Sequence, residues 1–290
     1  MQETELDTLK ATILAHFPDL AEARFSLLTN GFDSVAVDVD DRLIFKFPRH
    51  ETARQSLVRE VSLLSVIRPA IAMPVPDIRL VDGPPIFSHH AKLKGDYLET
   101  PYYARLSEPA RDDLAKQLAR FYVDLHGLDM EKMKAAGATP VEAWMEPDEV
   151  RERAPPLLSG ELKAHAERII ASWADLPPDP CGITYGFFDG HGWNLAFDQE
   201  TSRLSGVYDF ADSGFGSLHR DFVYSNFIST DLTERIVTNY EALSGRVLRR
   251  ERIEVLTGAH RLWELAAAVD DPPRIPFMMD HFAYWVTTLR

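Results

Sequence analysis

Three polar side chains that could act together on a phosphate group lie in the second half of the sequence. Asp189 and Asn194 are five residues apart in a glycine-rich loop, and Asp209 follows after one more apolar run. Residues 185–208 have the pattern of a strand end, a polar loop and a hairpin turning at 198–202, which would bring the three side chains to one end of the hairpin. Acidic groups at one mouth repel each other, so such a site usually takes up a cation.

A lysine and a glutamate far upstream suggest what that cation accompanies. Side chains alternate along the strand expected at residues 43–47, so Lys46 shares a face with Ile44, and Glu60 lies in the following helix. Phosphoryl transfer requires metal on the nucleotide phosphates, a cation on the α- and β-phosphates, and a group that orients the acceptor hydroxyl. Each has a candidate here, and Ile44 would cover an adenine ring. The alternative is an edge-strand lysine with a solvated helix glutamate.

Two loops have both a functional and a local explanation. Residues 30–34 read Asn-Gly-Phe-Asp-Ser, and the backbone N–H groups of Gly31 and Ser34 would cover phosphates, although an Asn-Gly hairpin turn explains the same letters. The loop from Asp189 to Asn194 is also rich in residues that occur in turns for local hydrogen bonding. Its position between strongly apolar strands favours a functional role.

Other polar residues near these motifs are interpreted as structural. His191 is expected to brace its loop rather than to bind metal. Asp212 and Asp221 are expected to cap or brace helices, with a structural role favoured for Asp221. Glu264 is expected at a solvated helix end, with substrate contact as the second interpretation.

Composition and charge limit the class of protein. The 290 residues, 45% hydrophobic and 26% charged, fit one large domain or two lobes. A formal net charge of −14 argues against a nucleic-acid partner. Residues 1–93 carry 10 Lys and Arg against 13 Asp and Glu, and residues 94–290 carry 21 against 32. The acidic second part would attract a cationic substrate, or it simply keeps its helices solvated.

Targeting signals and cysteine chemistry are not indicated by the sequence. No apolar run approaches ~20 residues, so no membrane span is expected. The N-terminus is acidic and has no basic-then-apolar signal pattern, which predicts a cytoplasmic protein. Cys181 is the single cysteine, which excludes an intramolecular disulfide and a thiolate metal cluster.

The hydrophobic periodicity changes near residue 93. Before this point the pattern predicts five strands, at residues 25–28, 35–39, 43–47, 78–81 and 86–93. Helices are expected at residues 5–17, 52–67, 107–127, 159–173, 231–243, 251–269 and 276–289. The pattern Asp231-Leu232-Thr233-Glu234 is typical of a capping box. We therefore expect an α+β protein with a five-stranded antiparallel N-terminal lobe (1–93), which has one inserted helix, and a mainly helical C-terminal lobe (94–290), with the site at their junction.

These residues resemble the aminoglycoside phosphotransferase family, which has the protein-kinase-like fold and is related to choline, homoserine and fructosamine kinases. The family pattern His-Gly-Asp-x-His-x-x-Asn is similar to the run from Asp189 to Asn194, and its Ile-Asp-Phe/Trp is similar to Tyr208-Asp209-Phe210. Lys46, Arg59-Glu60 and residues 31–34 and 93–96 extend the resemblance over about residues 27–221. One departure is Phe187-Phe188, which stands where the family has His-Gly.

The resemblance implies an ATP- and Mg²⁺-dependent kinase, with GTP as the alternative nucleotide. Lys46 would hold the α- and β-phosphates and Glu60 would orient it. Asp209 and Asn194 would bind two Mg²⁺ ions, and Asp189 would accept a hydrogen bond from the substrate hydroxyl and aim it at the γ-phosphate. Backbone groups at the end of the fifth strand would bind adenine, namely those of His90, Ala91 and Lys92.

The sequence is compatible with three functions. The first is a kinase for a small hydroxyl-bearing molecule, such as an aminoglycoside-like compound, an amino alcohol or a sugar. The second is a nucleotide-binding regulator without transfer activity, suggested by Phe187-Phe188. The third is a metal-dependent hydrolase that uses Asp189, His191 and Asp209, which would leave Lys46 unexplained.

Overall fold

The computed structural model describes residues 2–28 and 33–289. Its strands are β1 (Phe25–Leu28), β2 (Ser34–Val39), β3 (Leu43–Pro48), β4 (Arg79–Val81), β5 (Phe87–Ala91), β6 (Ile183–Gly186), β7 (Leu195–Asp198), β8 (Arg203–Val207) and β9 (Gly214–Ser217). Its α-helices are α1 (Gln2–His16), α2 (Glu51–Ile67), α3 (Thr100–Arg105), α4 (Glu108–His126), α5 (Met130–Ala135), α6 (Pro147–Arg153), α7 (Gly160–Ala174), α8 (Thr230–Ser244), α9 (Arg250–Ala267) and α10 (Ile275–Thr288). Among the described residues, no helix combines the length and apolar character needed to cross a membrane.

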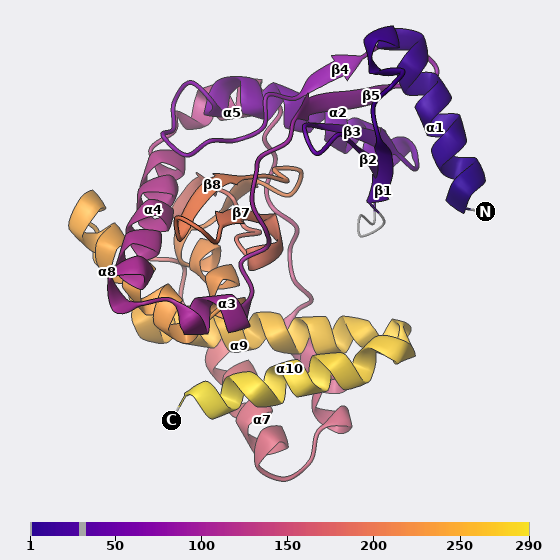
Figure 1. Ribbon diagram of the computed structural model, residues 1–290. Helices are drawn as coiled ribbons and strands as arrows, with labels where there is room; N and C mark the ends of the chain where they lie inside the picture. Colours follow the sequence, from indigo (N-terminus) through magenta and orange to yellow (C-terminus); the bar gives the residue numbers. More distant parts are fainter. Residues whose placement is uncertain (1, 29–32, 290) are drawn as a thin grey trace.

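The N-terminal lobe is a five-stranded antiparallel sheet in the order β1-β2-β3-β5-β4 (Figure 1). Strand β3 is central, so Lys46 is not on an edge strand as one interpretation of the sequence had it. The predicted alternation along β3 is confirmed, because Phe45 and Phe47 pack with Ile13 of α1 in one apolar cluster. The opposite face of β3 carries Ile44 and Lys46, and α2 follows β3 directly in the chain.

The C-terminal lobe is mainly helical around two small strand pairs. Strands β7 and β8 form the predicted hairpin, and β6 pairs with β9. Helices α4 and α8 form one flank, whereas α9 and α10 lie side by side beneath the hairpin with α7 below them (Figure 1). One large apolar cluster joins α2, α4, α8 and the hairpin, and a second joins α6, α7, α9 and α10.

The seven predicted helices are present with ends within three residues of those expected. Ser107 caps α4 by accepting a hydrogen bond from the Ala110 N–H, and Gly245 ends α8 with a left-handed φ of 71°. Helices α3, α5 and α6 were not predicted, because six or seven residues are too short to show a period. Strand β9 was missed because its Gly-Phe-Gly-Ser sequence has little strand propensity.

The capping-box prediction at Asp231 was wrong. Helix α8 begins one residue earlier, with Ser229 as N-cap and no side-chain cap bond. The Asp231 carboxylate instead accepts hydrogen bonds from Tyr103 and from Arg235, one turn further along the helix. Arg235, a charged side chain within α8, therefore binds the carboxylate that a capping box would direct to backbone N–H groups. A charged donor bonds to a carboxylate more strongly than a backbone N–H does.

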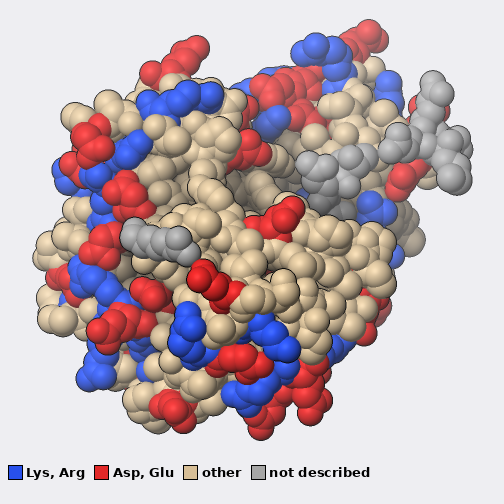
Figure 2. Space-filling model, turned by 90° about the horizontal axis from the view of Figure 1, so that it is seen from below, with Lys and Arg blue, Asp and Glu red and all other residues tan. Residues whose placement is uncertain are grey.

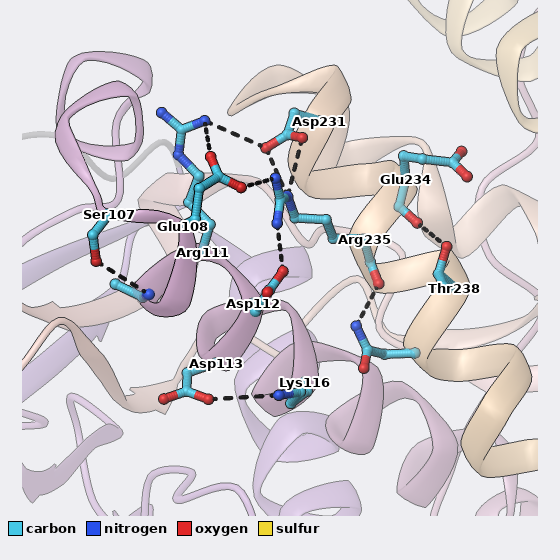
Figure 3. A network of polar contacts seen from close by, with 12 residues as sticks. Ser107, Glu108, Arg111, Asp112, Asp113, Lys116, Asp231, Glu234, Arg235 and Thr238 are labelled. Carbon is cyan, nitrogen blue, oxygen red and sulfur yellow. Dashed lines mark hydrogen bonds and ion pairs between the residues drawn. The ribbon is translucent and has the colours of Figure 1, made fainter.

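An ion network fastens α8 to α4 on the outer flank of this lobe (Figure 3). The Arg235 guanidinium pairs with Asp231 at 2.9 Å and with Glu108 at 2.6 Å, and it also contacts Asp112. Arg111 adds a second cation 3.7 Å from Asp231. Because only 22% of the Arg235 side chain is exposed, this network is better shielded from solvent than an ordinary surface pair.

We expect the Arg235→Met variant to lower the free energy of unfolding by about 1–2 kcal/mol, because several carboxylates lose their shared cation. Urea denaturation at low salt would measure this loss, which should shrink in 1 M NaCl. Lys116→Met is the matched control, since Lys116 and Asp113 form an exposed pair at 3.8 Å. Equal effects of the two substitutions would contradict a structural role for the network.

Candidate active site

Opposite charges from the two lobes meet at the base of the N-terminal sheet. Lys46 Nζ lies 3.5 Å from Asp209 Oδ1 and 3.9 Å from Glu60 Oε2. The Phe210 N–H donates to Glu60 Oε1 at 3.0 Å, so α2 also holds the backbone next to Asp209. The three residues predicted to handle nucleotide phosphates and metal are therefore brought together.

One ammonium group serves two carboxylates here. Burial acts to lower the pKa of Lys46, but Glu60 and Asp209 more than offset it, and the pKa is raised overall. Burial raises the pKa of Glu60, the Asp209 charge raises it further, and Lys46 opposes both effects. Lys46 is thus firmly protonated, while the surroundings retain an excess of negative charge.

The catalytic-loop candidates form one hydrogen-bonded set. Asn194 Nδ2 donates to Asp189 Oδ2 at 2.6 Å and to the Asp189 carbonyl at 3.0 Å. His191 Nε2 lies 3.0 Å from Asp189 Oδ1, so His191 braces the loop as expected. The Tyr208 N–H donates to the Asn194 carbonyl at 3.0 Å, which links the loop to the residue before Asp209.

Two glycines in this loop are required by close approach. A Cβ on Gly190 would lie 2.2 Å from the Tyr122 hydroxyl, and one on Gly192 would lie 1.9 Å from the Leu98 carbonyl oxygen. Neither distance leaves room for a Cβ, and at Gly192 the obstacle is backbone. The loop is therefore held against α4 on one side and against the chain entering α3 on the other.

The departure at Phe187-Phe188 has a structural explanation. The N–H groups of both phenylalanines donate to the buried Asp221 carboxylate, at 3.0 and 2.6 Å, and His126 Nε2 lies 3.0 Å from the same carboxylate. The ring of Phe187 packs 4.8 Å from the ring of Phe210. Phe188 has a left-handed φ of 56°, a strained conformation that these bonds stabilise. The structural role predicted for Asp221 is correct.

The predicted adenine-binding residues lie around the end of β5. Ile44 pairs with His90 across the strands and is buried. Burial lowers the pKa of His90 to about 4, so its ring is neutral, and its Nδ1 lies 2.9 Å from the Ala91 carbonyl. The Lys92 N–H already donates to the Arg42 carbonyl. A carbonyl oxygen has two lone pairs, so the Ala91 carbonyl can still accept a hydrogen bond from a ligand.

The structure places the Lys92 side chain and one of the two phosphate-loop candidates, Ser34, as follows. Lys92 Nζ donates hydrogen bonds to Asp38 at 2.5 Å and to Asp41 at 2.6 Å, so its charge is paired with carboxylates of the N-terminal lobe. Ser34 is half-buried at the start of β2. Gly31 lies outside the described residues.

Two acidic residues near the site, Asp212 and Glu264, differ from the structural or solvated roles that the sequence predicted for them. Burial of its carboxyl group and the charges of Asp189 and Asp209 raise the pKa of Asp212 to about 6, although the residue as a whole is exposed. Its spacing of three residues after Asp209 was the available signal. Glu264 is not at a solvated helix end: its side chain is 23% exposed, and it acts on the charge of His191.

Charges on the underside of the molecule are mixed. Figure 2 shows acidic and basic residues interspersed around a broad uncharged area, without a single large acidic patch on this face. The acidic excess of the C-terminal lobe is therefore not gathered there to steer a cation. One acidic residue of this lobe, Glu264, does act on the charge of His191 in the catalytic loop.

The chain is similar to known phosphotransferases. A model described as the phosphotransferase enzyme family matches residues 24–254. The GDP complex of wild-type aminoglycoside 2'-phosphotransferase-IIIa is similar with a TM-score of 0.82 and 20% identity, over 97% of this chain and 98% of that chain. The GDP and kanamycin complex of APH(2")-IIIa gives 0.79 and 19%, over 97% and 98%. Macrolide 2'-phosphotransferase MphH from Brachybacterium faecium gives 0.65 and 16%, over 93% and 98%. The fold is therefore protein-kinase-like.

The Glu264→Gln variant should be more stable than the wild type at pH 8 and equally stable at pH 4. Burial raises the pKa of Glu264 from 4.5 to about 7, so the native protein keeps a proton that the unfolded chain releases between these values. Native stability is therefore lost as the pH rises from about 4.5 through 7, on the order of 3 kcal/mol. Urea denaturation from pH 4 to pH 8 would measure it. Glu254→Gln, an exposed change in the same helix, should not alter the pH profile, and a parallel profile for Glu264→Gln would contradict the assignment.

Proposed function

The chain belongs to the phosphotransferase enzyme family, and on that premise we propose that it transfers the γ-phosphate of ATP, in a Mg²⁺-dependent reaction, to a hydroxyl group of a small molecule. The acceptor we propose is an aminoglycoside-like compound, an amino alcohol or a sugar. The observation that carries the proposal is the approach of Lys46 to Asp209, 3.5 Å apart, beside the hydrogen-bonded pair of Asp189 and Asn194.

The donor set fits a divalent cation. The side chains of Asp209 and Asn194 offer oxygen ligands of the kind that Mg²⁺ prefers. Burial first, and then the charges of Asp189 and Asp209, raise the pKa of the neighbouring Asp212, so negative charge gathers at the site. Asp209 and Asn194 would hold the metal. Bound there, Mg²⁺ neutralises charge on the nucleotide phosphates.

The side chains of this chain would perform the remaining tasks. Lys46, held by Glu60 and Asp209, would place its charge on the α- and β-phosphates. Both Asp189 oxygens already have a partner, His191 on one and Asn194 on the other, which fixes the direction of the carboxylate. A remaining lone pair of this carboxylate would accept a hydrogen bond from the substrate hydroxyl and align that hydroxyl with the γ-phosphate.

The acceptor would lie between the catalytic loop and α9. Trp193 is 57% exposed and its ring lies 5.0 Å from that of His191, so it offers an apolar surface to a sugar-like ring. Glu264 acts on the charge of the same histidine. Its Oε2 lies 3.6 Å from His260 Nδ1 and is buried without a hydrogen-bond partner in the described structure. A protonated amine of the acceptor would pair with Glu264, which supports an amine-bearing substrate.

The Asp189→Ala variant should lose on the order of 10²–10⁴ in turnover, the usual worth of a positioned base. Its affinity for ATP should change little, because Lys46 and Asp209 are retained. Coupled ADP release across a panel of hydroxyl compounds would measure turnover, and thermal shift with ATP would measure binding.

Asp175→Ala is the matched control, since Asp175 is exposed at the end of α7. Normal turnover in Asp189→Ala would contradict the assigned role. Wild-type protein that binds ATP but transfers nothing to any acceptor would instead favour the regulator hypothesis, and activity without nucleotide would favour the hydrolase.

ATP should raise the melting temperature of the wild type more with Mg²⁺ than with EDTA, because ligands that bind the native state stabilise it by mass action. Asp209→Asn should abolish the Mg²⁺-dependent part of the shift and keep the part seen in EDTA, since Lys46 still holds the phosphates. A shift of equal size with and without Mg²⁺ in the wild type would contradict the metal assignment.

A further inference from the structure

A cavity lies between α8, α9, α10 and the start of α3. Its volume is about 330 Å³, and its lining includes Thr100, Asn226, Ser229, Arg261, Trp285 and Thr288. None of these residues has a role in the proposed transfer reaction. The cavity combines a buried cation, unpaired N–H donors and a helix N-terminus.

The buried cation is Arg261. It is 3% exposed, and its guanidinium lies 4.4 Å from the ring centroid of Phe227 and 5.9 Å from that of Trp285. Its hydrogen bonds go to backbone carbonyls, those of Asn226 at 3.2 Å and His281 at 3.5 Å. Within residues 2–28 and 33–289 it forms no ion pair, since Glu264 acts on it only through space. A buried charge without a counter-ion is costly.

Two buried N–H donors of the lining residues also have no acceptor within the described structure, namely Arg261 Nε and Trp285 Nε1. Helix α8 adds backbone donors, because its first intrahelical bond comes from the Thr233 N–H and no side chain caps the N–H groups before it. Over 15 residues the helix dipole also favours negative charge at this end.

The one acidic residue of the lining is directed elsewhere. Asp231 bonds to Arg235 on the outer flank, with Arg111 nearby (Figure 3), and it also accepts a hydrogen bond from Tyr103. His281 also lines the cavity, but burial lowers its pKa to about 4, so it is neutral at pH 7. Arg261 is therefore the charge that the cavity presents.

We infer that this cavity binds a small oxyanion, a phosphate or a carboxylate group, which pairs with Arg261 and accepts hydrogen bonds from Trp285 and the first N–H groups of α8. The volume suits a compact metabolite-sized ion. The inference does not rest on the transfer reaction proposed above, and its test does not require turnover.

The cavity shares a wall with the catalytic loop. Ile228 lines it, and a Cβ on Gly192 would lie 3.3 Å from Ile228 Cγ1. Thr100, which also lines the cavity, donates a hydrogen bond to the Ile228 carbonyl at 2.9 Å. An occupant would therefore contact residues that pack directly on the loop bearing Asp189.

The test measures anion binding to the full chain by thermal shift and calorimetry, with a saturating non-hydrolysable ATP analogue so that phosphate cannot enter the nucleotide site. Inorganic phosphate at about 100 times its Kd should raise the melting temperature of the wild type by about 5 °C. Succinate is the second probe, and the tighter of the two identifies the preferred group. Sodium chloride at equal ionic strength should give no comparable shift.

Arg261→Met should weaken anion binding at least about tenfold, whereas Arg203→Met, an exposed change in β8, should not. If Arg261→Met fails to fold by circular dichroism, Thr288→Phe decides, because it keeps the arginine but fills the cavity from its rim. The inference is overturned if the wild type binds neither anion, or if folded Arg261→Met or Thr288→Phe keeps wild-type affinity.

Discussion

The ammonium group of Lys46 lies between carboxylates from both lobes, and the geometry of the site depends on this contact. Glu60 comes from the N-terminal lobe and Asp209 from the C-terminal lobe, 3.9 and 3.5 Å from Lys46 Nζ. One ammonium group cannot balance both carboxylates, and Asp189 and Asp209 act on the nearby Asp212 with negative charge that Arg59 opposes. The interaction therefore joins the lobes and leaves a negative excess that a metal ion and its nucleotide would neutralise. Moving either lobe would separate the ammonium group of Lys46 from Asp209.

The loop that carries Asp189 keeps its conformation by a different route from the one the sequence pattern suggested. Phe187-Phe188 cannot donate side-chain hydrogen bonds, but their backbone N–H groups bond to Asp221, which lies beside His126. The bracing charge thus comes from behind the loop, and the Phe187 ring packs on Phe210, directly after Asp209. This arrangement removes the structural reason for treating the loop as defective, and it favours a catalytic protein over a regulator.

The parts of the molecule that the sequence predicts well are those with a repeating signal. Alternation along residues 43–47 separated Lys46 from Phe45, and helical periods located the longer helices. Residues whose role depends on a partner distant in the sequence could not be interpreted from periodicity or spacing. Asp231 has the spacing of a helix cap, yet Arg235 and Tyr103 determine its conformation. Glu264 has the sequence surroundings of a solvated helix end, and only the fold brings it to His191.

Glu264 and Arg261 lie three residues apart on α9, so the two proposed ligand sites share one helix. Neither side chain has a charged partner at ion-pair distance among the described lysines, arginines, aspartates and glutamates, and each acts on the other through space: Arg261 opposes the burial that raises the pKa of Glu264. An anion at Arg261 would remove part of that opposition. The pKa of Glu264 would then rise further, and a neutral Glu264 holds an amine less strongly than a carboxylate does. Electrostatics along a single helix would thus make the two ligands compete, even without any movement of the backbone.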